Sequence, residues 1–112
     1  MYIDDCVKGI DQIMHSEALI ATPINLGSSE LVSINELVSM IENIAGVKLK
    51  RKYDLDAPQG VAGRNSDNTF IQEVLGWEPD TLLQKGMEKT YAWISRQYAD
   101  RKAGKYVPAG IH

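Results

Sequence analysis

The chain has only two runs that pattern as β-strands, and both are short. The first covers residues 23–27 and ends at a glycine, and the second covers residues 47–53 and alternates in polarity. Two short strands do not form a stable sheet by themselves, because a sheet needs more strands or a layer of helices over it. The sequence therefore predicts a small mixed α+β unit of the α/β class, mostly helical, whose strands lie under helices or join a larger sheet.

An apolar stripe at helical spacing predicts a helix over residues 5–15. Asp4 or Asp5 is expected to cap its first turn, because a carboxylate accepts hydrogen bonds from the unpaired N–H groups there. Two neighbouring carboxylates can also form a pair for acid–base catalysis. The capping preference favours the structural role for both.

Two capping boxes predict the starts of two further helices. In such a box the first side chain accepts from the backbone three residues on, and the second reaches back. Ser33 and Glu36 fit this pattern before an apolar run. Thr81 and Gln84 fit it before the longest predicted helix, over residues 82–102.

Charge and composition exclude several classes of function. The 112 residues include 12 basic and 15 acidic side chains, a net charge of -3, which gives no general attraction to nucleic acid or anionic membrane. Cys6 is the only cysteine, and His15 and His112 stand far apart, so neither a disulfide nor a metal site is expected. No apolar run approaches the roughly 20 residues that span a bilayer, and the acidic N-terminus does not pattern as a signal peptide. A cytoplasmic location is the expectation.

The usual catalytic patterns give no candidate. No strand leads through a Gly-rich turn into a helix, as a dinucleotide or nucleoside-triphosphate site requires. A nucleophile elbow is absent as well. No catalytic residue is therefore assigned, and redox chemistry is not expected of this chain alone.

The loop over residues 58–68 is the segment best suited to bind a ligand. Glycines such as Gly63 let the backbone approach a ligand closely, and Arg64 carries a planar guanidinium suited to phosphate. Asp67 can accept hydrogen bonds from sugar hydroxyls, and Asn65 lies between them. A turn in which Asp67 caps the next helix and Arg64 pairs with Asp67 explains the same spacing equally well.

Four segments resemble, in the same order, the C-terminal region of the extended short-chain dehydrogenases/reductases that act on nucleotide sugars, the NAD-dependent epimerases and dehydratases. The four segments are residues 2–7, 23–28, 33–37 and 75–79. The loop over residues 60–68 narrows the resemblance to the branch that epimerises GDP-mannose. Ala62 stands where that branch has an arginine.

The resemblance implies a C-terminal nucleotide-sugar-binding domain over residues 1–107, with a disordered tail over residues 108–112. It implies the substrate side of a Rossmann-type enzyme without its Rossmann domain, a GDP-hexose as the ligand, and NAD as the cofactor of the full-length isomerase. The chain alone is expected to bind no cofactor, to be inactive, and to self-associate through surface that a Rossmann domain would cover. Two alternatives remain. The chain is part of another sugar-nucleotide epimerase or dehydratase, or it is a stand-alone binding or assembly module without catalysis.

Overall fold

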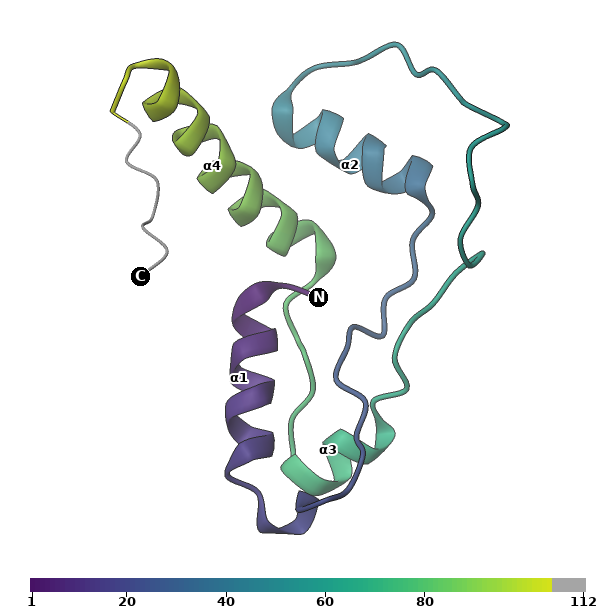
Figure 1. Cartoon of the computed structure of the whole chain (residues 1–112), viewed down its shortest axis with the longest axis vertical. Helices are drawn as coiled ribbons and strands as arrows, with labels where there is room; N and C mark the ends of the chain where they lie inside the picture. The colour runs from purple at the N-terminus through teal and green to yellow at the C-terminus, as the bar shows by residue number, and fades with distance from the viewer. Residues whose placement is uncertain (106–112) are drawn as a thin grey trace.

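A computed structural model describes residues 1–105 of the chain, which fold into four α-helices and one short 3-10 helix. The helices are α1 (Ile3–Met14), α2 (Ile34–Ala45), α3 (Thr69–Leu75) and α4 (Leu83–Lys102), and η1 (Glu17–Leu19) follows α1. Figure 1 shows α1 and α3 at one end of the molecule and α2 and α4 at the other. The expected tail over residues 108–112 lies outside the described residues.

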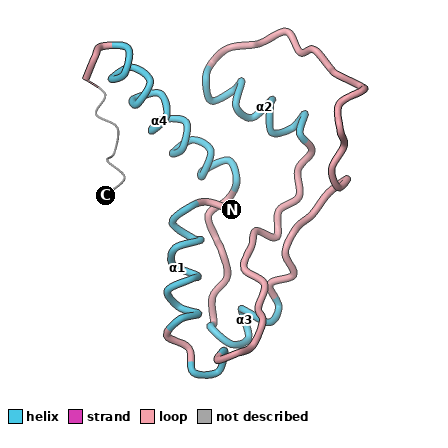
Figure 2. The backbone as a smooth tube through the Cα atoms, viewed as in Figure 1, coloured by secondary structure: helices cyan, strands magenta, loops and turns pink. Residues whose placement is uncertain are grey.

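The prediction of two short strands was wrong. Residues 23–27 and 47–53 form loops, and residues 1–105 contain no β-strand (Figure 2). Gly27, at the end of the first segment, packs against Ser66, whose N–H donates to the carbonyl of the next residue, Ser28 (2.9 Å). The second is held to α2 through side chains. With no regular ladder of backbone bonds, neither segment is a strand.

A part-buried ion pair holds the segment over residues 47–53 against α2. Arg51 donates to Glu42 Oε2 at 2.8 Å and to Ser39 Oγ at 2.8 Å, and the N–H of Leu49 donates to Glu42 Oε1 at 3.1 Å. These bonds from Arg51 and Leu49 lower the pKa of Glu42 below its usual range. Tyr53 adds a hydrogen bond from its hydroxyl to Asn35 Oδ1 at 3.0 Å.

One of the two predicted capping boxes is confirmed. Ser33 Oγ accepts from the N–H of Glu36 at 3.1 Å, and Glu36 accepts from the N–H of Ser33 at 2.6 Å, so α2 begins as expected. Hydrogen bonding from the backbone N–H of Ser33, and then from its side chain, lowers the pKa of Glu36. The box at Thr81 was wrong, because α4 begins at Leu83 and has no cap from its own segment. Glu30 caps α4 instead, accepting from the N–H of Leu83 at 2.7 Å.

Asp5 joins the first helix to the start of the last. Its carboxylate is buried and accepts two hydrogen bonds from Thr81, from the N–H at 2.9 Å and from Oγ1 at 3.0 Å. The expectation that Asp4 or Asp5 caps α1 was therefore wrong, since both lie inside its first turn and α1 has no side-chain cap. Asp5 instead connects segments 76 residues apart in the sequence.

The described residues bury little apolar surface. Among them only Leu19 and Ile71 are buried apolar side chains. The accessible surface is 9269 Å², whereas a folded monomer of 12.5 kDa exposes about 6200 Å². The radius of gyration is 18.0 Å, against roughly 13 Å for a compact domain of this length.

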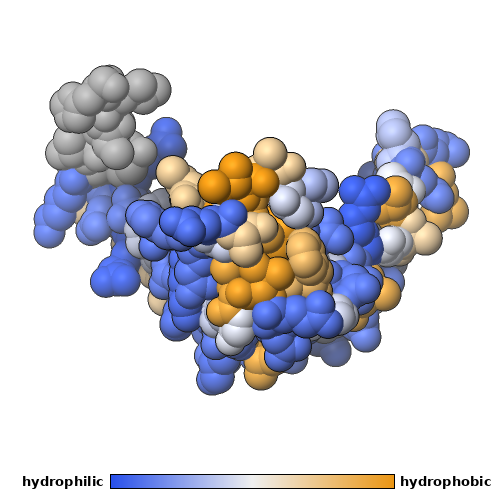
Figure 3. All heavy atoms as spheres, turned by 90° about the horizontal axis from the view of Figure 1, so that it is seen from below, coloured by the Kyte–Doolittle hydropathy of each residue, from blue (hydrophilic) through white to orange (hydrophobic). Residues whose placement is uncertain are grey.

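Exposed apolar side chains gather on particular faces. One face of α1 carries a stripe in which every side chain is about half exposed or more: Ile3, Val7, Ile10 and Met14. On α4, Trp93, Ile94 and Tyr98 are similarly exposed. Seen from the end where α1 meets η1, apolar residues form a contiguous patch (Figure 3). Contiguous exposed apolar patches of this kind occur at protein interfaces, membrane-binding surfaces and ligand-binding grooves.

Candidate functional site

The end of the long connection between α2 and α3 forms one wall of a hollow. Arg64, Asn65 and Ser66 line this wall, and residues 25–28, which follow η1, line the opposite one. The hollow has a volume of about 430 Å³. Two segments that lie about 40 residues apart in sequence therefore form the candidate binding site.

Three hydrogen bonds join the two walls, and we call the six bonded residues the clasp: residues 27–29, 65, 66 and 68. The N–H of Ser66 donates to Ser28 O at 2.9 Å. Asn68 Nδ2 donates to Gly27 O at 3.0 Å, and Asn65 Nδ2 donates to Ser29 O at 3.0 Å. The clasp fixes the backbone on both sides of the hollow.

Arg64 is the cation of this hollow. Its side chain is exposed, and no hydrogen bond or ion pair engages it within residues 1–105. It also borders an adjoining groove of about 420 Å³, which Leu31, Ile34 and Val61 make largely apolar. A guanidinium with no partner among the described residues, at the junction of a polar hollow and an apolar groove, is available to an anionic ligand.

Asp67 is engaged with the helix that follows it. Its Oδ1 accepts from the N–H of Thr69 at 3.0 Å and from Thr69 Oγ1 at 2.7 Å, and these bonds lower the pKa of Asp67. The pairing of Asp67 with the start of α3 agrees with the turn interpretation. The pairing of Arg64 with Asp67, which that interpretation also required, does not occur.

The other two predicted site residues hold different positions. Asn65 lines the hollow, although its side-chain amide is used in the clasp. Gly63 lines the adjoining groove and packs close to Leu31, because a Cβ at position 63 would lie 3.2 Å from Leu31 Cδ1. The structure therefore brings Arg64 and Asn65 to the hollow and places Gly63 and Asp67 beside it.

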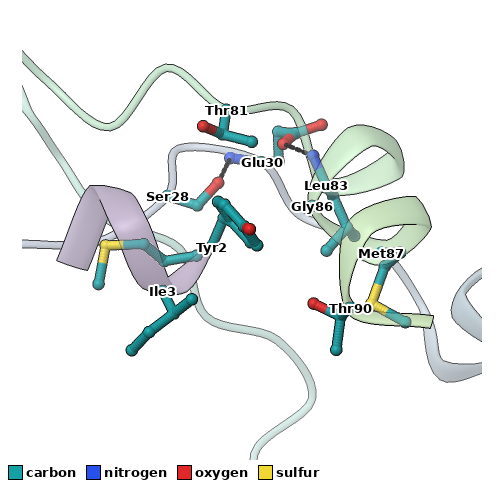
Figure 4. Close-up of a pocket in the computed structure, with 10 residues that line it drawn as sticks. Tyr2, Ile3, Ser28, Glu30, Thr81, Leu83, Gly86, Met87 and Thr90 are labelled. Atoms are coloured by element: carbon teal, nitrogen blue, oxygen red, sulfur yellow. Dashed lines mark hydrogen bonds between the residues drawn. The ribbon is translucent and has the colours of Figure 1, made fainter. Parts of the chain in front are cut away.

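Sequence reasoning missed the wall opposite Arg64. Asn25, Gly27 and Ser28 line it, and Glu30 lines the same hollow. Figure 4 shows the neighbouring hollow, of about 210 Å³, where Tyr2 lies against Gly86 of α4 and Glu30 reaches Leu83. Nothing local in the sequence pairs these residues with the loop at residues 58–68. The short run that ends at Gly27 was the only signal at this position.

A further spacing was overlooked in the sequence. Tyr98 and Lys102 near the end of α4 stand four residues apart, as in a Tyr-x-x-x-Lys proton-transfer pair. Tyr98 is 68% exposed, and neither residue lines the hollows described above. The pair therefore gains no support as a catalytic site.

The helices and loops described above offer neither a metal site nor a membrane span. The part of the chain that the structure describes has no group of three or more His, Cys, Asp or Glu residues placed to hold a metal ion. No helix within residues 1–105 is both long enough and apolar enough to cross a membrane.

The chain is similar to nucleotide-sugar enzymes over most of its length, although no family model matches it. It is 35% identical over 101 residues to an uncharacterized UDP-glucose epimerase of Bacillus subtilis, covering 87% of this chain and 31% of that protein. It is 29% identical over 107 residues to UDP-glucuronic acid decarboxylase 1 of Danio rerio, covering 96% of this chain and 25% of that protein. The chain belongs to the NAD-dependent epimerase/dehydratase family of extended short-chain dehydrogenases/reductases.

Within this family, the chain is similar to GDP-mannose 3,5-epimerase. It is 41% identical over 102 residues to that enzyme of Arabidopsis thaliana, which covers 91% of this chain and 26% of the relative. The chain thus spans about a quarter of the length of the curated relative that it matches.

Proposed function

We propose that this chain is the part of a nucleotide-sugar epimerase that binds and positions the nucleotide sugar, most like the corresponding part of GDP-mannose 3,5-epimerase. The observation that carries the proposal is the guanidinium of Arg64, which has no partner among the described residues, in a hollow of about 430 Å³. Its planar donors suit the two phosphates of a GDP-hexose. The name of the Arabidopsis relative supports GDP-mannose as the ligand class.

The remaining groups of the hollow suit the uncharged part of such a ligand. Asn25 and Ser28 carry polar side chains that can bond to hydroxyl groups, whereas Ser66 lines the hollow with its Oγ buried. Glu30 also lines the hollow, and its carboxylate accepts a hydrogen bond from the N–H of Leu83. Arg64 then binds the diphosphate while these neutral groups orient the sugar or the ribose.

The described residues do not fit a dinucleotide. Within residues 1–105 no strand leads through a Gly-rich turn into a helix, the arrangement that holds a pyrophosphate at a helix N-terminus. We assign NAD to the part of the full-length enzyme that lies outside this chain. No proton or hydride transfer is assigned to the residues of this chain, whose role is to bind and orient.

The exposed apolar stripe on α1 supports a second element of the proposal, a covering partner. We propose that the Rossmann domain of the full-length enzyme covers the stripe and the neighbouring patch of Figure 3. The relatives are about four times as long as the matched region, so they contain further polypeptide that can supply it. Without that partner, the same surface is expected to bring copies of this chain together.

A titration with GDP tests the proposed function. NMR spectra of the chain are recorded with increasing GDP, and the amide shifts of Arg64, Asn65 and Ser66 give the dissociation constant. Replacing Arg64 by Ala removes charge-assisted bonds worth about 1.5–3 kcal/mol, so the affinity should fall roughly ten- to a hundredfold. Replacing Arg64 by Lys should restore part of it, because a point charge does not reproduce the planar fork.

Arg96→Ala is the matched control, because Arg96 is an exposed arginine on α4, outside the hollow. It removes the same charge and should leave GDP binding unchanged. Equal affinities for the Arg64→Ala and Arg96→Ala variants would contradict the proposed function.

A further inference from the structure

The strongest feature that the proposed function leaves unused is the buried amide of Asn68. Its side chain is 5% exposed, so it is the most deeply buried of the clasp residues. Its Nδ2 donates to Gly27 O at 3.0 Å, while Oδ1 has no partner among the described residues. The carbonyl of Gly27 accepts and cannot donate, so the amide nitrogen must face it.

An amide at position 68 supplies the donor that the carbonyl of Gly27 requires. A carboxylate at position 68 would place an acceptor against the acceptor of Gly27, and an apolar side chain would leave that carbonyl without a partner. The other side-chain bond of the clasp comes from Asn65, which is exposed, so water can replace it. The bond from Asn68 is therefore the one whose loss opens the clasp.

Gly27 shows how closely the two walls approach. A Cβ at position 27 would lie 2.9 Å from Ser66 Cβ, closer than side-chain atoms pack. The backbone of residue 27 thus lies directly against Ser66, two residues from Arg64. Anything that separates these walls moves the backbone that carries Arg64.

We propose that Asn68 is a positioning residue that holds Arg64 over the hollow. This inference rests on the proposed function, because it takes Arg64 to be the group that binds the diphosphate. Asn68 does not line the hollow itself. Its effect on a ligand is transmitted through the clasp, from Gly27 through Ser66 to Arg64.

Two measurements on the same chain test the proposal. Hydrogen exchange of the Ser66 amide, which donates to Ser28 O, reports whether the clasp is closed without any ligand. The titration with GDP reports binding. Asn68→Leu should speed exchange of the Ser66 amide at least about tenfold and weaken GDP binding roughly five- to twentyfold. Asn43→Leu, at an exposed position on α2, is the control and should change neither.

A double variant separates positioning from direct binding. If Asn68 acts through Arg64, adding Asn68→Leu to Arg64→Ala should weaken GDP binding no further than Arg64→Ala alone. Gly27→Ala, which opens the clasp from its other wall and keeps Asn68, should reproduce the effect of Asn68→Leu on both measurements. This second variant keeps the test decisive if Asn68→Leu fails to fold.

The outcomes that would overturn the proposal are distinct. If the clasp opens and GDP binding is unchanged while Arg64→Ala weakens it, the proposed function stands and Asn68 has no positioning role. If Asn68→Leu weakens binding by the same factor in the original chain and in the Arg64→Ala variant, Asn68 acts independently of Arg64. If Arg64→Ala leaves binding unchanged, the proposed function fails and this inference fails with it.

Discussion

Replacement of Asp5 by Ala should remove the connection between the first and last helices. The carboxylate of Asp5 is 5% exposed and accepts both the N–H and the hydroxyl of Thr81, at 2.9 and 3.0 Å. The Ala variant lacks any acceptor, so the N–H of Thr81 loses its partner. Water cannot easily replace the carboxylate at so buried a position.

The magnitude follows from the two bonds. A hydrogen bond to a charged group contributes about 1.5–3 kcal/mol, which gives roughly 3–6 kcal/mol for the pair. Thr81 is only partly buried, and water recovers some of the hydroxyl's bond, so about 3 kcal/mol is the expected loss. Folded proteins are stable by about 5–15 kcal/mol, and the variant should lose a large part of that.

Urea unfolding followed by circular dichroism is the assay. With a denaturant slope of about 1.5 kcal/mol/M, the loss corresponds to a midpoint roughly 2 M lower. Asp5→Asn keeps one acceptor and should lose about half as much. Asp4→Asn, at an exposed neighbouring carboxylate, is the control and should lose no more than about 0.5 kcal/mol. Equal midpoints for the Asp5→Asn and Asp4→Asn variants would refute the reasoning.

Three further predictions concern the loop, the exposed surface and the cofactor. The bond from Arg51 lowers the pKa of Glu42 in the folded chain. The stabilisation that this pair gives the fold is therefore complete above the pKa of Glu42 in the unfolded chain, and it is lost as the pH falls through the lower pKa of Glu42 in the folded chain. The Leu49 amide should therefore be less protected from hydrogen exchange in acid. The Glu42→Gln variant should not show this dependence on pH. Identical pH profiles for the original chain and the variant would contradict the prediction. Light scattering should show self-association that rises with concentration and weakens when Val7 is replaced by Glu, whereas a monomer at every concentration would count against a covering partner for α1. Calorimetry should detect no micromolar binding of NAD, and saturation in that range would show a dinucleotide site in this chain.

Local signals in the sequence predicted what local interactions determine. The box at Ser33 and Glu36 forms because both partners lie within one turn of α2. The same pattern at Thr81 failed because Asp5, far away in sequence, takes both of its donors. A capping rule that reads only four neighbouring residues cannot detect such a competitor.

Contacts between residues far apart in sequence also explain why the strand prediction was wrong and why one wall of the site was missed. Alternating polarity over residues 47–53 favoured a strand, but Arg51 reaches Glu42 on a helix and fixes the segment through side chains. The loop carrying Arg64 was found because its composition is distinctive. The wall formed by residues 25–28 was missed because its position depends on hydrogen bonds across about 40 residues of sequence.

The long connection between α2 and α3 is anchored near both of its ends and little held between them. Arg51 and Glu42 secure its beginning, the clasp secures its end, and one side-chain bond, from the N–H of Asp56 to Asp54, is formed within the intervening stretch. Doubling the length of a flexible loop costs only about 0.6 kcal/mol in closure entropy. Insertions and substitutions near residues 54–62 should therefore be tolerated without displacing Arg64.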